Sequence, residues 1–167
     1  MRKTVLIPTD FTVKSLNLVK SALNANDDCQ LEIILLHGIY LPDSISELLF
    51  FRKKEVIRKL ENTAFKESCE LLLGKYGSRI ESISADLFSG YNQSAFENYL
   101  EGNRVDEIYA FSEYDFRACH KRSFDLMPLI EKTSVHLTKV KWVDHGRRHD
   151  LDKNQLAALF FGHFSPS

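Results

Sequence analysis

The 167-residue sequence contains only three cysteines, and no two of them form a CxxC pair. Cys29, Cys69 and Cys119 are far apart, which argues against a disulfide framework and against a zinc site. Cys29 and Cys69 fall in segments of apolar pattern, so we expect both to be small buried fillers. Cys119 precedes the basic run 120–122, whose charges are expected to lower the pKa of its thiol. A redox role for this thiol is nevertheless the less favoured interpretation.

The sequence also has no excess of charge of either sign. It contains 22 lysines and arginines against 23 aspartates and glutamates, for a formal net charge of −1. General nucleic-acid binding needs a clustered basic face, so this balance argues against a nucleic-acid partner. The local basic runs at 52–54 and 120–122 are typical of solvated surface.

Long apolar runs are lacking as well. No uninterrupted apolar segment approaches the length needed to span a membrane. The amino terminus has only a short apolar run before Pro8 and Asp10, which does not indicate a signal peptide. We therefore expect one cytoplasmic domain of ordinary size with no membrane partner.

Short apolar runs alternate with segments of helical spacing. The expected strands are 4–8, 31–38, 79–88, 105–111 and 134–140. The expected helices are 15–26, 45–76 with a break near 51–54, 93–100, and a short helix capped by Asp125 that ends near residue 133. This alternation predicts crossover units and a parallel sheet covered on both faces, which makes a single three-layer α/β sandwich.

Polar residues follow the first strand, at the sheet edge where ligands usually bind in open α/β folds. Thr9 and Asp10 form the start of a tight turn. Asp10 either contacts a small ligand or stabilises an Asx-type turn or helix cap, and the sequence leaves both interpretations open.

Two further residues are expected at the same edge. His37 ends the second strand, and we favour a buried, hydrogen-bonded histidine because no acidic partner or nucleophile lies nearby in sequence. Ser112 follows the fourth strand, but no G-x-S-x-G elbow surrounds it, which argues against nucleophilic hydrolysis. No catalytic constellation is found, so we expect a protein that is not an enzyme.

Three segments resemble segments of universal stress proteins in their residues and in their order along the chain. Residues 5–12 (Val-Leu-Ile-Pro-Thr-Asp-Phe-Thr) resemble the hydrophobic strand and (V/P)-x-D-x-S/T turn that open those proteins. Residues 35–37 (Leu-Leu-His) resemble their Leu-His-Val strand end, and residues 105–108 (Val-Asp-Glu-Ile) resemble their A-D-L-I segment. The resemblance covers about 1–142 and implies a five-stranded parallel sheet of order 3-2-1-4-5, as in the adenine nucleotide α-hydrolase group. Its switch point lies between the first and fourth strands.

The sequence departs from the ATP-binding branch of that family. There the fourth strand leads into Gly-x2-Gly-x9-Gly-Ser/Thr, which here falls on Phe111, Tyr114, Phe124 and Asp125. Aromatic side chains do not permit the close backbone approach that glycine permits, and a carboxylate repels polyphosphate. We therefore predict that ATP is not bound in the family's manner and that no cofactor is present.

An anion site at this edge remains the alternative. Arg117 and Lys121 offset the acidic charge, so a nucleotide or other anion sensor could use them together with Asp10 in an altered pose. The candidate ligand residues at the edge of the first and fourth strands are Thr9, Asp10, His37, Ser112, Arg117 and Lys121.

Residues 143–167 form an extension beyond the family domain. Asp152 is a helix N-cap before a short amphipathic segment that Gly162 stops, and docking on its own domain or on a partner stays open. His145 and His149 have i,i+4 spacing, but a solvated linker is favoured over a metal site.

The last strand, whose first and last residues are Val135 and Val140, is expected at a sheet edge. The resemblance implies that this edge pairs with a second copy to give a homodimer, with the C-terminal helix as a possible contributor. It also implies a role in stress adaptation through protein or small-ligand binding.

Overall fold

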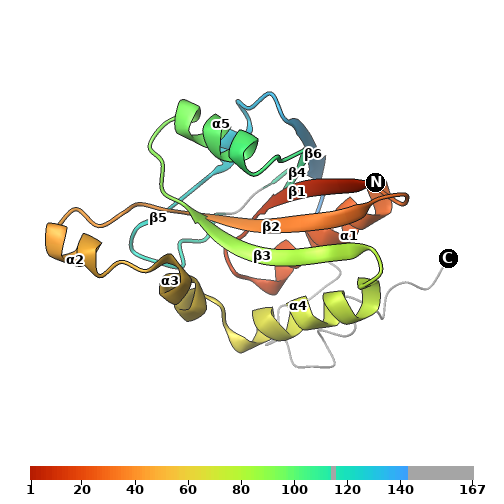
Figure 1. Cartoon of the computed structure of the whole chain (residues 1–167), viewed down its shortest axis with the longest axis horizontal. Coiled ribbons are helices and arrows are strands. Elements are labelled where there is room, and N and C mark those ends of the chain that lie inside the picture. Colours follow the sequence, from red (N-terminus) through yellow and green to blue (C-terminus); the bar gives the residue numbers. More distant parts are fainter. Residues whose placement is uncertain (114–115, 143–167) are drawn as a thin grey trace.

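The computed structural model describes residues 1–113 and 116–142. Its main sheet has the order β3-β2-β1-β4-β6, and every neighbouring pair along this path is parallel (Figure 1). The strands are β1 (Arg2–Pro8), β2 (Gln30–Ile39), β3 (Ile80–Phe88), β4 (Glu107–Phe111) and β6 (His136–Val140). The predicted order 3-2-1-4-5 is confirmed for these strands.

Helices cover both faces of the sheet (Figure 1). A 3-10 turn (Val13–Leu16), α1 (Asn17–Ala25), α3 (Lys53–Leu60) and α4 (Thr63–Tyr76) pack on one face, and α5 (Gln93–Gly102) and α6 (Met127–Ile130) pack on the other. Val5 and Ile7 contact the first set and Leu6 contacts the second, because successive strand residues point to opposite faces. The predicted three-layer sandwich is confirmed.

The long helical segment is divided into three helices rather than two. α2 (Ile45–Leu49) and α3 are separated at the predicted break near 51–54. A second break precedes α4, where the side chain of Asn62 accepts a hydrogen bond from the N–H of Phe65 at 2.8 Å. An asparagine in this capping role begins a new helix, and the apolar periodicity alone did not reveal it.

A sixth strand, β5 (Ser123–Phe124), was not predicted. It pairs antiparallel with β2, with Gly38 opposite Phe124. Gly38 also pairs with Phe88 of β3, so β5 must lie on the other side of β2, the side that β1 occupies as far as Leu36. The predicted five-stranded parallel sheet therefore carries one additional short antiparallel strand. The chain segment after β4 crosses beyond the end of β1.

The predicted extension 143–167, with the His145 and His149 pair and the helix after Asp152, lies outside the described residues. Among residues 1–113 and 116–142, no helix has both the length and the apolar character needed to cross a bilayer.

Candidate functional site

The turn after β1 uses its polar side chains to hold its own backbone. The Thr9 hydroxyl accepts a hydrogen bond from the N–H of Phe11 at 3.0 Å and lies 2.8 Å from the hydroxyl of Ser15. The Oδ1 of Asp10 accepts hydrogen bonds from the N–H of Thr12, at 3.1 Å, and from its hydroxyl. Asp10 therefore has the turn-stabilising role, one of the two interpretations that the sequence left open.

Phe11 occupies the space next to this turn in a strained conformation. Its φ is 60°, in the left-handed region that bulky residues seldom adopt, and its side chain is only 2% exposed. Its ring packs against Phe65, with centroids 5.4 Å apart, and against the ring of His37 at 5.5 Å. Burial of the ring stabilises a backbone conformation that would otherwise be unfavourable.

Phe111, at the end of β4, is packed into the same side of the sheet. It is 4% exposed and contacts Trp142 edge to face, with ring centroids 5.7 Å apart. The ammonium group of Lys14 lies 5.4 Å from the centroid of Phe111 and 5.1 Å from that of Trp142. Phe111, which the sequence resemblance aligns with the first glycine of the ATP-binding branch, is thus a buried aromatic ring.

Phe124 and Asp125 are engaged on the other face of the sheet. The ring of Phe124 stacks on Tyr40 at 4.3 Å and packs against the core under α5. The Oδ1 of Asp125 accepts a hydrogen bond from the N–H of Met127 at 2.9 Å, but the N-cap of α6 is Leu126 and not Asp125 as expected. Tyr114 lies outside the described residues.

His37 is buried and hydrogen-bonded at both ring nitrogens. Its Nδ1 lies 2.7 Å from the carbonyl oxygen of Thr9, which can only accept, so Nδ1 carries the proton. Its Nε2 then accepts a hydrogen bond from the hydroxyl of Ser123 at 2.7 Å, and the sulfur of Cys119 lies 3.3 Å away. Burial lowers the pKa of His37, so the neutral ring is favoured.

Cys119 differs from its predicted state. Cys119 is an exposed residue, yet desolvation of its thiol raises the pKa more than the hydrogen bond with Ser123 lowers it, whereas the basic run beside it was expected to lower the pKa. The pair of Cys119 and His37 is therefore uncharged at neutral pH, and the sulfur is not held as a thiolate. Cys29 is buried and Cys69 half-buried, and burial raises the pKa of Cys69 to about 12. Both fit the expected filler role.

The remaining candidates lie on the surface of the segment that follows β4. Ser112 is exposed, and its N–H donates to the carbonyl of Val140 at 2.9 Å. Arg117 and Lys121 are exposed too, and within the described part of the chain neither makes a hydrogen bond or ion pair. The structure therefore does not join these two cations to Asp10.

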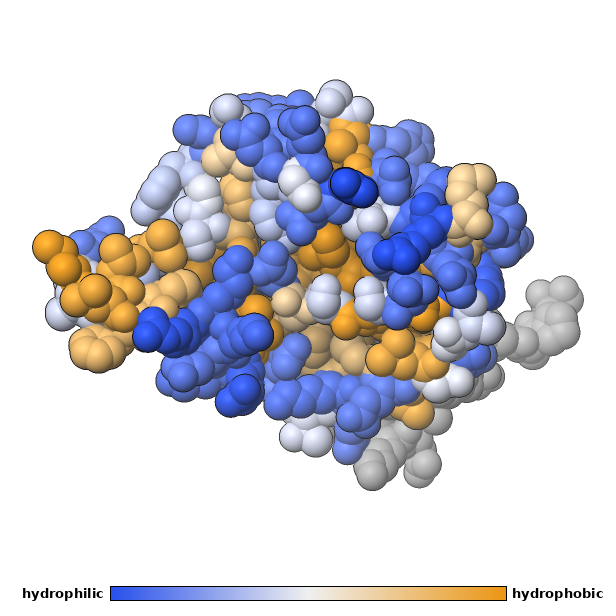
Figure 2. Space-filling view, viewed as in Figure 1, coloured by the Kyte–Doolittle hydropathy of each residue, from blue (hydrophilic) through white to orange (hydrophobic). Residues whose placement is uncertain are grey.

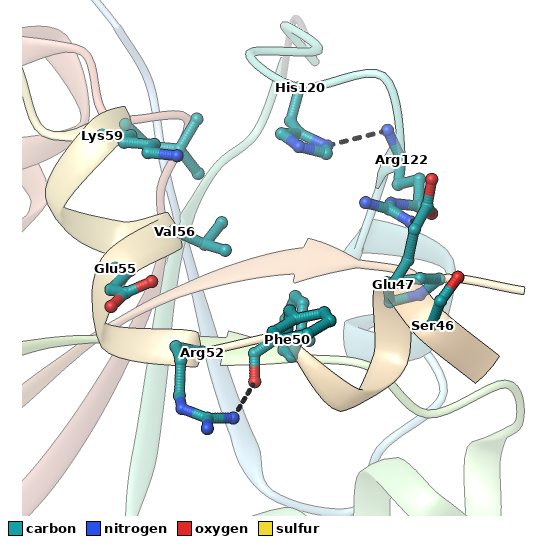
Figure 3. A pocket seen from close by; sticks show the side chains of 12 residues that line it. Ser46, Glu47, Phe50, Arg52, Glu55, Val56, Lys59, His120 and Arg122 are labelled. Carbon is teal, nitrogen blue, oxygen red and sulfur yellow. Dashed lines mark hydrogen bonds and ion pairs between the residues drawn. The ribbon is translucent and has the colours of Figure 1, made fainter. Parts of the chain in front are cut away.

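A cavity of about 450 Å³ lies beside this edge, between α2, α3 and the segment that leads into β5 (Figure 3). Its apolar lining comes from Pro42, Phe50, Phe51, Val56 and Leu60, and its polar lining comes from Ser46, Glu47, Arg52, Glu55, Lys59, His120 and Arg122. This combination suits a small molecule that has both an apolar body and a polar group.

The cations of this cavity come from both sides of it. Arg52 and Lys59 come from the start and the body of α3, and Arg122 lies across the hollow beside Glu47 of α2 (Figure 3). One nitrogen of Arg122 pairs with Glu47 at 3.3 Å, while its buried Nε has no hydrogen-bond partner among the described residues. A buried donor without a partner is costly, whereas the terminal nitrogens of a guanidinium can still donate to an anionic group.

His120 adds a neutral donor to the cavity. Its Nδ1 accepts a hydrogen bond from the N–H of Arg122 at 3.0 Å, so the proton of the neutral ring is on Nε2. Desolvation first, and then the charges of Arg122 and Lys121, lower the pKa of His120.

This cavity was not predicted from the sequence. The basic runs 52–54 and 120–122 were expected to be solvated surface, whereas the structure places Arg52 and Arg122 around one hollow. The apolar pair at 50–51, next to the first run, is the one sequence signal that these cations border apolar surface.

Comparisons with known proteins identify the fold. No model of a protein family matches the chain, and no curated protein matches it either. A protein of the universal stress protein family from Burkholderia pseudomallei superposes with a TM-score of 0.51 at 7% identity, covering 84% of this chain and 96% of that one. The chain has the universal stress protein fold. UspA from Lactobacillus plantarum gives a TM-score of 0.52 at 10% identity, covering 83% of this chain and 97% of its own. The resemblance seen in the sequence is thus confirmed at the level of fold, which by itself does not specify function.

Proposed function

We propose that the chain is a cytoplasmic, non-enzymatic binding protein that acts in stress adaptation through a small anionic ligand. The ligand occupies the cavity between α2, α3 and the segment before β5, and not the nucleotide position of the ATP-binding branch. The observation that carries this proposal is that three cations, Arg52, Lys59 and Arg122, line one cavity together with apolar side chains. A lining of apolar side chains and cations together favours an organic anion over a bare inorganic one.

The packing at the end of β1 and β4 supports the exclusion of ATP from the family's position. Phe11 and Phe111 are both buried there, and Asp10 already uses its carboxylate in the turn. A triphosphate would have to displace these rings and accept a carboxylate nearby, which is unfavourable for like charges.

Calorimetry with phenyl phosphate and with ATP plus magnesium tests the proposal. Phenyl phosphate is the probe because it joins one ring to one phosphate. We expect it to bind and ATP plus magnesium to give no micromolar binding. Arg122→Met should weaken phenyl phosphate binding roughly tenfold or more, since it removes a charge-assisted hydrogen bond.

Arg117→Met is the matched control, because it removes an exposed arginine outside the cavity. We expect it to leave binding unchanged. The alternative anion sensor at the edge of β1 and β4, built from Asp10, Arg117 and Lys121, predicts the reverse order of effects. Micromolar binding of ATP, or loss of phenyl phosphate binding with Arg117→Met alone, would contradict the proposal.

We also propose a homodimer through β6. This strand ends the path of the sheet and pairs only with β4 among the described strands, so its outer edge is available for pairing with a second copy. Light scattering at micromolar concentration should give a dimer mass. A proline at Thr138, near the middle of β6, should reduce it to the monomer mass.

A further inference from the structure

Helix α2 presents a cluster of apolar side chains to solvent. We name it the α2 tip and define it by Ile45, Leu48, Leu49 and Phe50, which are 77%, 47%, 67% and 79% exposed. Figure 1 shows α2 projecting at one end of the long axis, and Figure 2 shows its apolar surface gathered there. Within the described chain no residue of α2 is buried, so packing of the domain does not explain the cluster.

The local structure holds this tip in place. A five-residue helix is unstable by itself in water. Here the Ser44 hydroxyl accepts a hydrogen bond from the N–H of Glu47 at 3.2 Å, at the start of α2. At its end, the guanidinium of Arg52 donates to the carbonyls of Leu49 and Phe51, both at 3.2 Å. The tip is thus fixed at both ends while its side chains stay exposed.

Cations border the tip on α3, which follows it directly. Residues 52–60 contain five lysines and arginines and one glutamate. We name the exposed members Arg52, Lys54, Arg58 and Lys59 the basic collar. Figure 2 shows strongly hydrophilic surface next to the apolar surface of α2.

Ion pairs near the basic collar do not cancel its positive charge. Glu47, the acidic residue within α2, is paired with Arg122 at 3.3 Å. Lys53 is paired with Asp86 at 3.0 Å and is left out of the collar for that reason. Lys54 and Arg58 are four residues apart on α3 and therefore share one face of that helix.

We propose that the α2 tip and the basic collar dock on the surface of an anionic lipid membrane. The apolar side chains would enter the boundary between headgroups and acyl chains, while the cations would meet lipid phosphates and carboxylates. The expectation of no membrane partner rested on the lack of a spanning segment, and a surface contact needs none.

A membrane fits this surface better than a second copy of the chain. A twofold contact places the same patch on both partners, so the two basic collars would face each other and repel. A small projecting tip also offers less area to a flat protein partner than to the soft interface of a bilayer.

Sedimentation of the full chain with lipid vesicles tests the proposal. We expect binding to vesicles of phosphatidylcholine and phosphatidylserine in equal parts, and little binding to phosphatidylcholine alone. Added salt should weaken the binding, since it screens the collar. If the chain does not bind the anionic vesicles, the proposal is wrong.

Two double variants assign the binding to the surface, each with a matched control. Ile45→Ser with Leu49→Ser removes apolar area from the tip, and Lys54→Glu with Arg58→Glu reverses charge in the collar. None of these four residues lines the cavity. We expect each pair to lower vesicle partitioning by about tenfold or more.

The controls are Leu71→Ser with Leu73→Ser, two leucines on α4 that are 37% and 39% exposed, and Lys132→Glu with Lys141→Glu, two exposed lysines. Both should bind vesicles as the unchanged chain does, and equal losses in variants and controls would overturn the proposal. Light scattering gives a further readout. If the Ile45 and Leu49 pair converts a dimer into a monomer, the tip is an interface between copies and the membrane proposal is wrong.

Discussion

His37 and Ser123 are 86 residues apart in the chain, yet Nε2 of the histidine lies 2.7 Å from Oγ of the serine. The other ring nitrogen of His37 donates to the carbonyl of Thr9 at the end of β1. One buried imidazole therefore links the ends of β1 and β2 to β5. The His37 ring thereby connects the segment between β4 and α6 to the main sheet.

This link predicts that stability falls in mild acid. Burial lowers the pKa of His37 in the folded protein below its ordinary value of 6.5. As the pH drops below 6.5 the unfolded chain takes up a proton that the folded chain does not, so the free energy of unfolding decreases by at most about 1.4 kcal/mol per pH unit from this group. His120, whose pKa is also lowered, contributes with the same sign. Urea unfolding at about pH 7.5 and about pH 5.5 measures the slope.

His37→Gln should reduce this dependence, because glutamine does not titrate there. His136→Gln, at an exposed histidine on β6, serves as the control and should keep the slope of the unchanged protein. An unaltered slope in His37→Gln would show that this ring is not the source of the acid sensitivity.

A second prediction concerns the close approach of β5 to β2. A Cβ added to Gly38 would lie 2.7 Å from the carbonyl oxygen of Phe124 and 2.9 Å from its ring. The backbone atom cannot move without opening the β5 pairing, so Gly38→Ala should cost roughly 1–3 kcal/mol of unfolding free energy. Thermal or urea unfolding gives the value.

Gly74 offers the matched control for that substitution. It lies within α4, and a Cβ there would meet nothing within 4 Å. Gly74→Ala should therefore stabilise the protein by about 0.5–1 kcal/mol, since alanine favours helix. The two glycine-to-alanine changes should thus have opposite signs, and a neutral Gly38→Ala would contradict the tight contact with β5.

A third prediction concerns the end of α5. The N–H of Arg104 bonds to the carbonyl of Glu101, and the N–H of Val105 bonds to that of Leu100, which is the hydrogen-bond pattern of a Schellman motif. Arg104 has a φ of 53° at the position where glycine is usual. Arg104→Gly should therefore raise the free energy of unfolding by about 0.5–1 kcal/mol, measured by urea unfolding.

Arg104→Ala separates this backbone effect from loss of the exposed side chain. Alanine keeps the unfavourable left-handed conformation, so we expect little change in stability. If alanine and glycine stabilise equally, the gain comes from removing the arginine side chain and not from relief of strain.

Most of the fold could be predicted from the sequence because its strands and helices are locally consistent. β1 and β2 are nearly continuous apolar runs, and their residues Val5, Ile7, Leu31 and Ile33 are all fully buried. β5 could not be predicted, since two residues carry no periodicity and their pairing depends on a glycine 86 residues earlier.

Less of the candidate site than of the fold could be predicted from the sequence. The turn at Asp10 and the buried state of His37 follow from local chemistry. The turn-stabilising role of Asp10 was one of two predicted interpretations, and a buried, hydrogen-bonded His37 was the favoured one. The cavity brings Arg52 together with Arg122, 70 positions apart in the sequence, and only the crossing of the chain beyond β1 places them around one hollow. The aromatic residues at 111 and 124 are evident in the sequence. Their packing on opposite faces of the sheet, with Phe124 beside Tyr40, could not be predicted from it.

The antiparallel strand β5 also bears on how a nucleotide pocket could be rebuilt in this scaffold. The N–H of Tyr40 donates a hydrogen bond to the carbonyl of Arg122 at 3.0 Å. The segment before β5 is therefore bonded to the end of β2 through its main chain as well as through side chains. Replacing Phe111 and Phe124 by glycine would remove two rings but would leave this backbone pairing in place. Designing a phosphate-binding loop at this place would therefore require a different backbone path between β4 and α6.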